Sequence, residues 1–206
     1  MDMALWLSLV GFVFAMSYTP GPNNLMVMSS SALFGVRRTL PHWLGMNVGF
    51  NVMLVAAVFG LGELVLRFPV ALVVVKAGGS LWLAWMAWQY AVAALNPLPA
   101  AARSAGQTRT RPFRTYEAAL FQWVNPKAMM MSVSAAGAYV ALADTAPERA
   151  AIMVGTFLCF GAPAGLAWMF AGGTLKRFMG DPRWARILNA AIAGIILLTI
   201  ALILLG

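Results

Sequence analysis

The sequence predicts an all-α integral membrane protein, and two observations carry that prediction. Of its 206 residues, 62% are hydrophobic and only 10% are charged, whereas a soluble domain is about 45–50% apolar and about 25% charged. A soluble monomer of this size has too little interior to bury such an apolar excess. The apolar runs, such as residues 190–198, do not alternate with period two, so helices are favoured over a membrane barrel.

Six apolar segments are long enough to cross a bilayer, because one crossing needs roughly 20 helical residues. A polar stretch rich in proline and arginine separates the first three segments from the last three. We therefore predict one transmembrane domain, residues 1–206, with a first repeat (about 1–95), a basic loop (96–114) and a second repeat (about 115–206). The six segments are residues 4–33, 40–66, 69–95, 115–141, 149–173 and 185–205.

The first segment is interrupted near its middle by two prolines. Pro20 and Pro22 lack backbone N–H groups, so the carbonyls of Met16 and Tyr18 lose their helical partners. At membrane depth, freed backbone groups are tolerated only where protein or a water-filled cavity satisfies them. The segment begins after Asp2 without a basic residue, so we expect it to be retained rather than removed as a signal peptide.

Two asparagines follow these prolines. Asn23 and Asn24 are expected to cap the helix that resumes after the break, and the N-terminal dipole of that helix favours an anion. Many transporters build their substrate site at a broken helix. The alternative interpretation is a proline kink with structural asparagines. The candidate binding residues of this segment are Tyr18, Pro20, Gly21, Pro22, Asn23 and Asn24.

The second and third segments carry polar residues and small residues at depth. Asn47 and Asn51 are four residues apart, so they share a helical face that would line a polar path. Lys76 either lines this path or extends to the interface. Gly45 and Gly49 form a small-residue motif that favours close helix packing.

The fourth segment contains a second interruption. Pro126 frees the carbonyl of Gln122, and Asn125 precedes the proline as an N-cap does. Lys127 follows within an apolar run, where an ionisable side chain indicates a functional site by default. The alternative for Lys127 is a lysine that extends to the interface or is satisfied by its neighbours. All four residues are candidates for substrate binding.

The two interruptions are spaced by half the chain. Pro22 and Pro126 are 104 residues apart in a chain of 206. Three segments per half make the second half enter the bilayer from the opposite side. We therefore predict six transmembrane helices arranged as two inverted three-helix repeats, with the first and fourth helices broken and the site near the membrane midplane.

The basic residues set the expected orientation, since they gather in the connections after segments one, three and five. The positive-inside rule puts these connections in the cytoplasm and both termini on the outer side of a bacterial inner membrane. If the first segment is re-entrant, the N-terminus lies inside. Glu63 and Glu117 lie near helix ends and are either coupling residues or plain interfacial ones.

No catalytic or metal-binding motif is recognisable in the sequence. A single cysteine, Cys159, and a single histidine, His42, supply neither a nucleophile with its base nor a metal site. We therefore expect no metal, no cofactor and no enzyme activity, and we assign the net charge of +8 to membrane topology rather than to a nucleic-acid partner. A scaffold or channel subunit remains the alternative to a transporter, although it would not require paired breaks.

These motifs resemble the LysE/RhtB family of amino-acid exporters. The resemblance covers nearly the whole chain, and residues 15–24 with 45–50 look most like the cysteine/O-acetylserine exporter branch. Three positions depart from the family pattern, namely Phe50 in place of a common acidic residue, Trp82 and Ala87. The matching motifs are residues 20–24, Gly45 with Gly49, residues 76–89, residues 121–127, and Leu188-Asn189 with Gly194.

The resemblance implies efflux of a neutral amino acid or derivative, such as cysteine, O-acetylserine, threonine or homoserine, driven by a proton or ion gradient. Alternatives are efflux of a basic amino acid or another small metabolite. The expected partners are this substrate and the lipid bilayer, and the packing glycines are compatible with a homodimer. For a zwitterion, we expect the carboxylate at the two helix N-termini and Lys127, and the ammonium group at the freed carbonyls near Met16, Tyr18 and Gln122.

Overall fold

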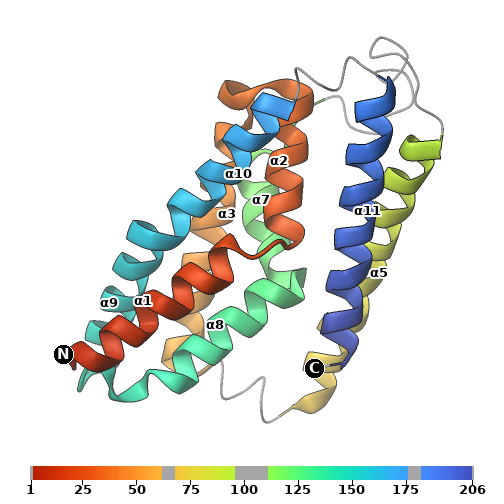
Figure 1. Cartoon of the computed structure of the whole chain (residues 1–206). Helices are drawn as coiled ribbons and strands as arrows, with labels where there is room; N and C mark the ends of the chain where they lie inside the picture. The colour runs from red at the N-terminus through yellow and green to blue at the C-terminus, as the bar shows by residue number, and fades with distance from the viewer. Residues whose placement is uncertain (1, 62–67, 96–110, 176–181, 206) are drawn as a thin grey trace.

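A computed structural model describes residues 2–61, 68–95, 111–175 and 182–205, and shows a helical molecule (Figure 1). These residues form no β-strand. Short turns join or extend the helices, namely the π-helical turns η1 (Ala57–Leu61) and η4 (Phe157–Gly161) and the 3-10 turns η2 (Gln122–Val124) and η3 (Val140–Leu142). The helices are α1 (Met3–Tyr18), α2 (Pro22–Phe34), α3 (Val36–Ala56), α5 (Pro69–Leu95), α7 (Thr115–Phe121), α8 (Pro126–Ala138), α9 (Ala146–Thr156), α10 (Ala162–Leu175) and α11 (Pro182–Leu205).

The predicted helical segments are confirmed where the chain is described, and both predicted interruptions are present. Val36–Gly60 and Ala146–Thr174 are each long and apolar enough to span a membrane. Met3–Tyr18 and Pro22–Phe34 qualify as a third span if this pair, bent by 50°, is counted as one. The described residues thus contain two or three candidate spans by length and composition.

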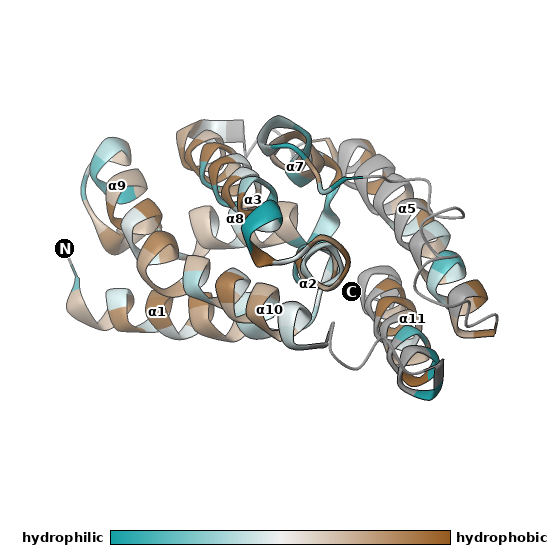
Figure 2. Ribbon diagram, turned by 90° about the horizontal axis from the view of Figure 1, so that it is seen from above, coloured by the Kyte–Doolittle hydropathy of each residue, from teal (hydrophilic) through white to brown (hydrophobic). Residues whose placement is uncertain are grey.

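The helices form two groups that both ribbon views separate (Figures 1 and 2). The long helices α5 and α11 lie side by side and contact each other extensively, while the remaining helices form the larger group. Leu25 and Met28 of α2 pack against Ala87 of α5 and Ile196 of α11, which joins the two groups. The two broken helices both belong to the larger group.

Many large apolar side chains are exposed, and the hydropathy-coloured ribbon shows apolar residues in most of the helices (Figure 2). Phe14, Val52, Leu120 and Phe170 are large apolar residues from four different helices, and each is more than half exposed. Such extensive apolar exposure is unfavourable in water but suits contact with lipid chains. The composition of the sequence therefore corresponds to an apolar exterior.

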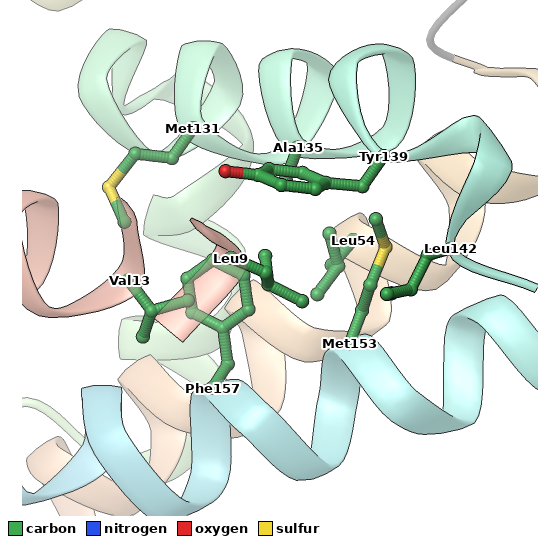
Figure 3. Close-up of a cluster of buried hydrophobic side chains, with 9 residues drawn as sticks. All are labelled: Leu9, Val13, Leu54, Met131, Ala135, Tyr139, Leu142, Met153 and Phe157. Atoms are coloured by element: carbon green, nitrogen blue, oxygen red, sulfur yellow. The ribbon is translucent and has the colours of Figure 1, made fainter. Parts of the chain in front are cut away.

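The main apolar core lies where α1, α3, α8 and α9 converge (Figure 3). Leu9 of α1, Leu54 of α3, Met153 of α9 and Leu142 of η3 are fully buried there. Asp2 fixes the start of α1, because its Oδ1 accepts hydrogen bonds from two backbone N–H groups of the first turn. This core packs helices α1 and α3 of the first half of the chain against α8 and α9 of the second half.

Glycines allow close backbone contact between α3 and α7, as predicted for Gly45 and Gly49. A Cβ atom at Gly45 would overlap the carbonyl oxygen of Thr115, and one at Gly49 would overlap that of Ala119. The α3 helix can therefore lie directly on the backbone of α7. The packing role expected for this motif is confirmed.

Candidate functional site

A pocket lies where the two broken helices meet. Its volume is about 80 Å³, several times the roughly 10–15 Å³ that a cavity needs to hold one water molecule. Residues from both halves of the chain contribute to it. Its lining is Met16, Ser17, Gly21, Asn23, Asn24, Met46, Asn47, Phe50, Asn51, Asn125, Lys127, Ala128, Met131, Phe157, Gly161 and Gly165.

The first break separates α1 from α2 in extended backbone. The α1 helix ends at Tyr18, and α2 begins at Pro22 with Gly21 as its N-cap and no side-chain cap. The prediction that Asn23 and Asn24 cap α2 is therefore wrong. Because Pro22 already adopts the first helical position, which suits its fixed φ, both asparagines lie inside the first turn.

The two asparagines make tertiary hydrogen bonds instead. Asn24 donates from Nδ2 to the carbonyl oxygens of Ser17 (2.8 Å) and Thr19 (3.0 Å), which ties the end of α1 to the start of α2. Asn23 donates to Oε1 of Gln122 (2.6 Å), and Gln122 donates back to Oδ1 of Asn23 (3.2 Å). This reciprocal amide pair connects the two halves of the chain and fixes the bend at the first break.

The second break is capped as the sequence predicted. Asn125 is the N-cap of α8, and its Oδ1 accepts a hydrogen bond from the backbone N–H of Lys127 (3.1 Å). The carbonyl of Gln122, which Pro126 cannot engage, accepts the N–H of Asn125 instead (3.2 Å). The freed carbonyl expected at Gln122 therefore already has a partner. The Gln122 residue itself is completely buried.

Lys127 reaches across to the first break. Its Nζ donates to the carbonyl oxygens of Thr19 (2.8 Å) and Pro20 (3.4 Å). A Cβ atom on Gly21 would lie 2.7 Å from Cδ of Lys127, so the absence of a side chain at Gly21 makes room for the lysine stem. Lys127 therefore joins the two breaks rather than extending to an interface.

The electrostatics of the pocket favour an anion. The first turns of α2 and α8 both contribute to its lining, so two helix N-termini direct their positive ends toward one space. Among the described lining residues, Lys127 carries the only charge. Two of the three N–H groups of its ammonium are engaged by backbone carbonyls, which leaves the third for a ligand.

One face of α3 forms a polar wall of the pocket. Asn47 donates from Nδ2 to the carbonyl of Trp43, and Asn51 donates from Nδ2 to the carbonyl of Asn47, both at 2.8 Å. The Oδ1 atom of Asn51 is buried and has no hydrogen-bond partner in the described part of the chain. The two residues predicted to line a polar path thus lie together at the pocket.

Other predicted residues do not line the pocket. Glu117 forms a two-pronged ion pair with Arg111 (2.8 Å for each contact) and accepts the backbone N–H of Arg114 at the start of α7. This interaction raises the pKa of the Arg111 guanidinium. Tyr18 stacks on Phe14 with ring centroids 4.4 Å apart. Pro20 and Pro22 shape the break, and Glu63 and the side chain of Lys76 lie outside the described residues.

Several apolar residues of the pocket were missed by the sequence interpretation. Phe157 and Gly161 come from the π-helical turn η4, which has no proline or polar residue to signal it. Phe50 is three residues after Asn47 and four after Met46, so helical spacing relates it to both of these lining residues of α3. The π-helical geometry is itself common at functional sites.

Comparison with known proteins relates this geometry to one family. The family model described as LysE type translocator matches residues 12–206. A cysteine/O-acetylserine efflux protein from Klebsiella pneumoniae is 32% identical over 162 residues, which is 77% of each chain. A protein of the same name from Escherichia coli K12 is 24% identical over 176 residues, or 85% of each chain. No solved structure matches the chain.

Proposed function

The chain belongs to the LysE type translocator family, and from this membership we propose that it exports a small neutral amino acid or derivative. It is a membrane transporter rather than an enzyme. The relatives named above are cysteine/O-acetylserine efflux proteins, so cysteine and O-acetylserine are the first substrates to consider. Threonine and homoserine have the same backbone groups and similar size.

The observation that carries the proposal is the meeting of two broken helices at one pocket. Lys127 and the N-termini of α2 and α8 offer positive charge and N–H dipoles at the same place. This arrangement suits the carboxylate that every amino acid carries. We assign substrate binding to the residues of the two breaks, with Asn24 and Asn125 holding the backbone in position.

The volume and charge of the pocket support a small neutral substrate. The small volume of the pocket, about 80 Å³, favours an amino acid with a short side chain over one with a long side chain. The described lining contains no carboxylate, so the second positive charge of a basic amino acid would have no anionic partner there. Met46, Phe50 and Phe157 supply apolar contacts that suit a short side chain.

For the architecture, we propose six transmembrane helices in two inverted repeats that rock about the pocket. The two helix breaks are 104 residues apart. The irregular turns η1, which is kinked at Gly60 (φ 112°), and η4 begin 100 residues apart. The same order of elements is found in both halves. A broken helix comes first, then a helix with an irregular turn, and then a long final helix. This order supports alternating access around a site shared by the repeats.

For the orientation, we propose a bacterial inner membrane with both termini outside. The two ends of the chain lie at the same end of the molecule, and α3 and α11 begin at the opposite end (Figure 1). Arg37, Arg38, Arg183 and Arg186 belong to these helix starts, which therefore face the cytoplasm by the positive-inside rule. A proton or ion gradient drives export, with Glu63 and Lys76 as coupling candidates. The homodimer expected from the packing glycines stays a prediction.

Counterflow in proteoliposomes tests the proposed function. Vesicles loaded with unlabelled L-cysteine, L-serine, L-threonine, L-homoserine or L-lysine are diluted into labelled amino acid, and transient accumulation is followed. We expect accumulation with the small neutral amino acids and little with L-lysine. Accumulation with L-lysine alone would reassign the substrate class, and no exchange with any member would favour a scaffold.

A further inference from the structure

The buried Oδ1 atom of Asn51 accepts no hydrogen bond from the described residues. We propose that Oδ1 of Asn51 accepts a hydrogen bond from the α-ammonium group of the substrate, and that this contact makes Asn51 a specificity-determining residue. The assignment rests on the proposed function, because it requires an amino acid in the pocket. It gives α3 a direct part in recognition, separate from the two breaks.

The orientation of the Asn51 amide supports this role. Its Nδ2 is held at 2.8 Å from the carbonyl oxygen of Asn47, one turn earlier in α3. That bond fixes the amide plane and leaves Oδ1, the buried acceptor of a residue that lines the pocket, without a partner among the described residues. A buried acceptor without a donor destabilises the protein, so a ligand that donates a hydrogen bond there gains binding energy.

Backbone carbonyls next to those of Met16 and Tyr18, where the ammonium group was expected, already have hydrogen-bond donors. Lys127 donates to the carbonyl oxygens of Thr19 and Pro20, and Asn24 donates to those of Ser17 and Thr19. A substrate ammonium at the first break would therefore lie beside the Lys127 ammonium, and the two positive charges would repel each other. An acceptor on α3 avoids this repulsion.

The chemistry of the wall also explains selectivity for net neutral molecules. An amide oxygen is a good acceptor for an ammonium group but carries no full charge. The substrate's own carboxylate, held by Lys127 and the helix N-termini, balances its ammonium group. A carboxylate at position 51 would add a negative charge to the pocket and favour a cationic substrate.

A variant without the acceptor tests the contact directly. Asn51→Leu keeps the number and branching of the non-hydrogen side-chain atoms and removes the Oδ1 acceptor together with the Nδ2 donor. Inhibition of labelled L-cysteine counterflow is measured with two competitors, unlabelled L-cysteine and 3-mercaptopropionate, which lacks the amino group. In the wild type, L-cysteine is expected to be the stronger competitor. Asn51→Leu should reduce this preference about tenfold or more, because it removes one hydrogen bond to a charged donor.

Thr39→Val provides the matched control. Thr39 lies in the same helix, is fully buried and donates from its side chain to the carbonyl of Gly35 four residues earlier, as Asn51 does to Asn47. It does not belong to the pocket lining. We expect Thr39→Val to keep the wild-type preference for L-cysteine over 3-mercaptopropionate.

A second variant keeps the test decisive if Asn51→Leu does not fold. Asn51→Asp retains the acceptor and adds a negative charge, so it should increase counterflow of L-ornithine relative to L-cysteine at least about fivefold. An unchanged preference in the variants that fold would overturn the role of Asn51 while leaving export intact. Absence of counterflow in the wild type would instead reject the proposed function.

Discussion

Lys127 connects the two breaks with a single side chain. Its ammonium bonds carbonyl oxygens that belong to the other half of the chain, at Thr19 and Pro20, and it also faces the pocket. In an apolar medium a charged group needs such partners, because an isolated ammonium is strongly unfavourable there. A substrate carboxylate that bonds the same ammonium would alter the contact between the halves, which gives binding a way to influence movement.

Replacement of Lys127 should stop transport. Lys127→Met removes the charge and both cross-break hydrogen bonds but keeps an unbranched apolar stem. We expect L-cysteine counterflow to fall at least tenfold, on the scale of about 1.5–3 kcal/mol for a charged hydrogen bond. Counterflow is measured at equal amounts of reconstituted protein.

Arg149→Met is the matched control for this prediction. Arg149 also donates to two backbone carbonyls, those of Val140 and Ala143, but it lies outside the pocket lining. Its replacement should leave counterflow within about twofold of wild type, since exposed cation contacts contribute little. Equal losses in both variants would show that the effect of Lys127 is structural.

Gly21 should be sensitive to a single methyl group. In Gly21→Ala the new Cβ would lie 2.7 Å from Cδ of Lys127 and 3.0 Å from its Nζ, so the lysine must move away from the first break. We expect weaker L-cysteine counterflow, by roughly three- to tenfold, with little change in thermal stability. Gly137→Ala in α8, where nothing lies within 4 Å of the added Cβ, should leave transport unchanged.

Close backbone contacts between helices indicate which helix pairs should move as rigid units. Gly45 and Gly49 bring α3 onto the backbone of α7, and Gly172 brings α10 onto that of α2 near Met28. Backbone contacts of this kind leave no flexible side chain to move aside. These two helix pairs therefore act as fixed units, and larger movements are expected where side chains alone form the contact.

A side chain in the α3–α7 contact should destabilise the protein. In Gly49→Val the branched side chain would overlap the backbone of Ala119, and overpacking of this type costs about 1–3 kcal/mol or more. We expect a lower melting temperature in detergent, measured by tryptophan fluorescence. Gly155→Ala in α9, where the added Cβ meets nothing within 4 Å, should melt at or slightly above the wild-type temperature. Equal melting of Gly49→Val and wild type would contradict this packing.

The sequence allowed prediction of the elements but not of all their connections. Prolines mark both breaks because their missing N–H acts locally, and the cap at Asn125 follows from the next residue being a proline. The partners of Asn23 and Lys127 were not predictable, since they depend on how the two halves meet. Those of Asn24 depend on the bend between α1 and α2. The π-helical turns have no local signature either.

At the scale of the whole molecule, the amide pair of Asn23 and Gln122 links the halves near the pocket. The pair is reciprocal, with distances of 2.6 and 3.2 Å, and Gln122 is fully buried. Removal of one partner leaves the other without its hydrogen bond, whereas removal of both avoids that penalty. The pair is therefore a direct test of how strongly the halves are coupled.

A double-mutant cycle measures this coupling. Asn23→Ala and Gln122→Ala should each lower stability by about 1–2 kcal/mol, and the double variant should lose less than the sum. The free energies come from reversible unfolding in detergent, and a coupling of about 0.5–2 kcal/mol is expected. Additive losses would mean that the two side chains act independently.

If both breaks form one substrate site, a change at either break should weaken substrate binding, which is measured at equilibrium. Labelled L-cysteine is titrated into purified wild-type protein under reducing conditions, and into Gly21→Ala, Lys127→Met and Thr39→Val. We predict saturable binding to the wild type, clearly weaker binding to the variant at either break, and wild-type affinity for Thr39→Val. No saturable binding to the wild type, or unchanged affinity in both break variants, would contradict the account.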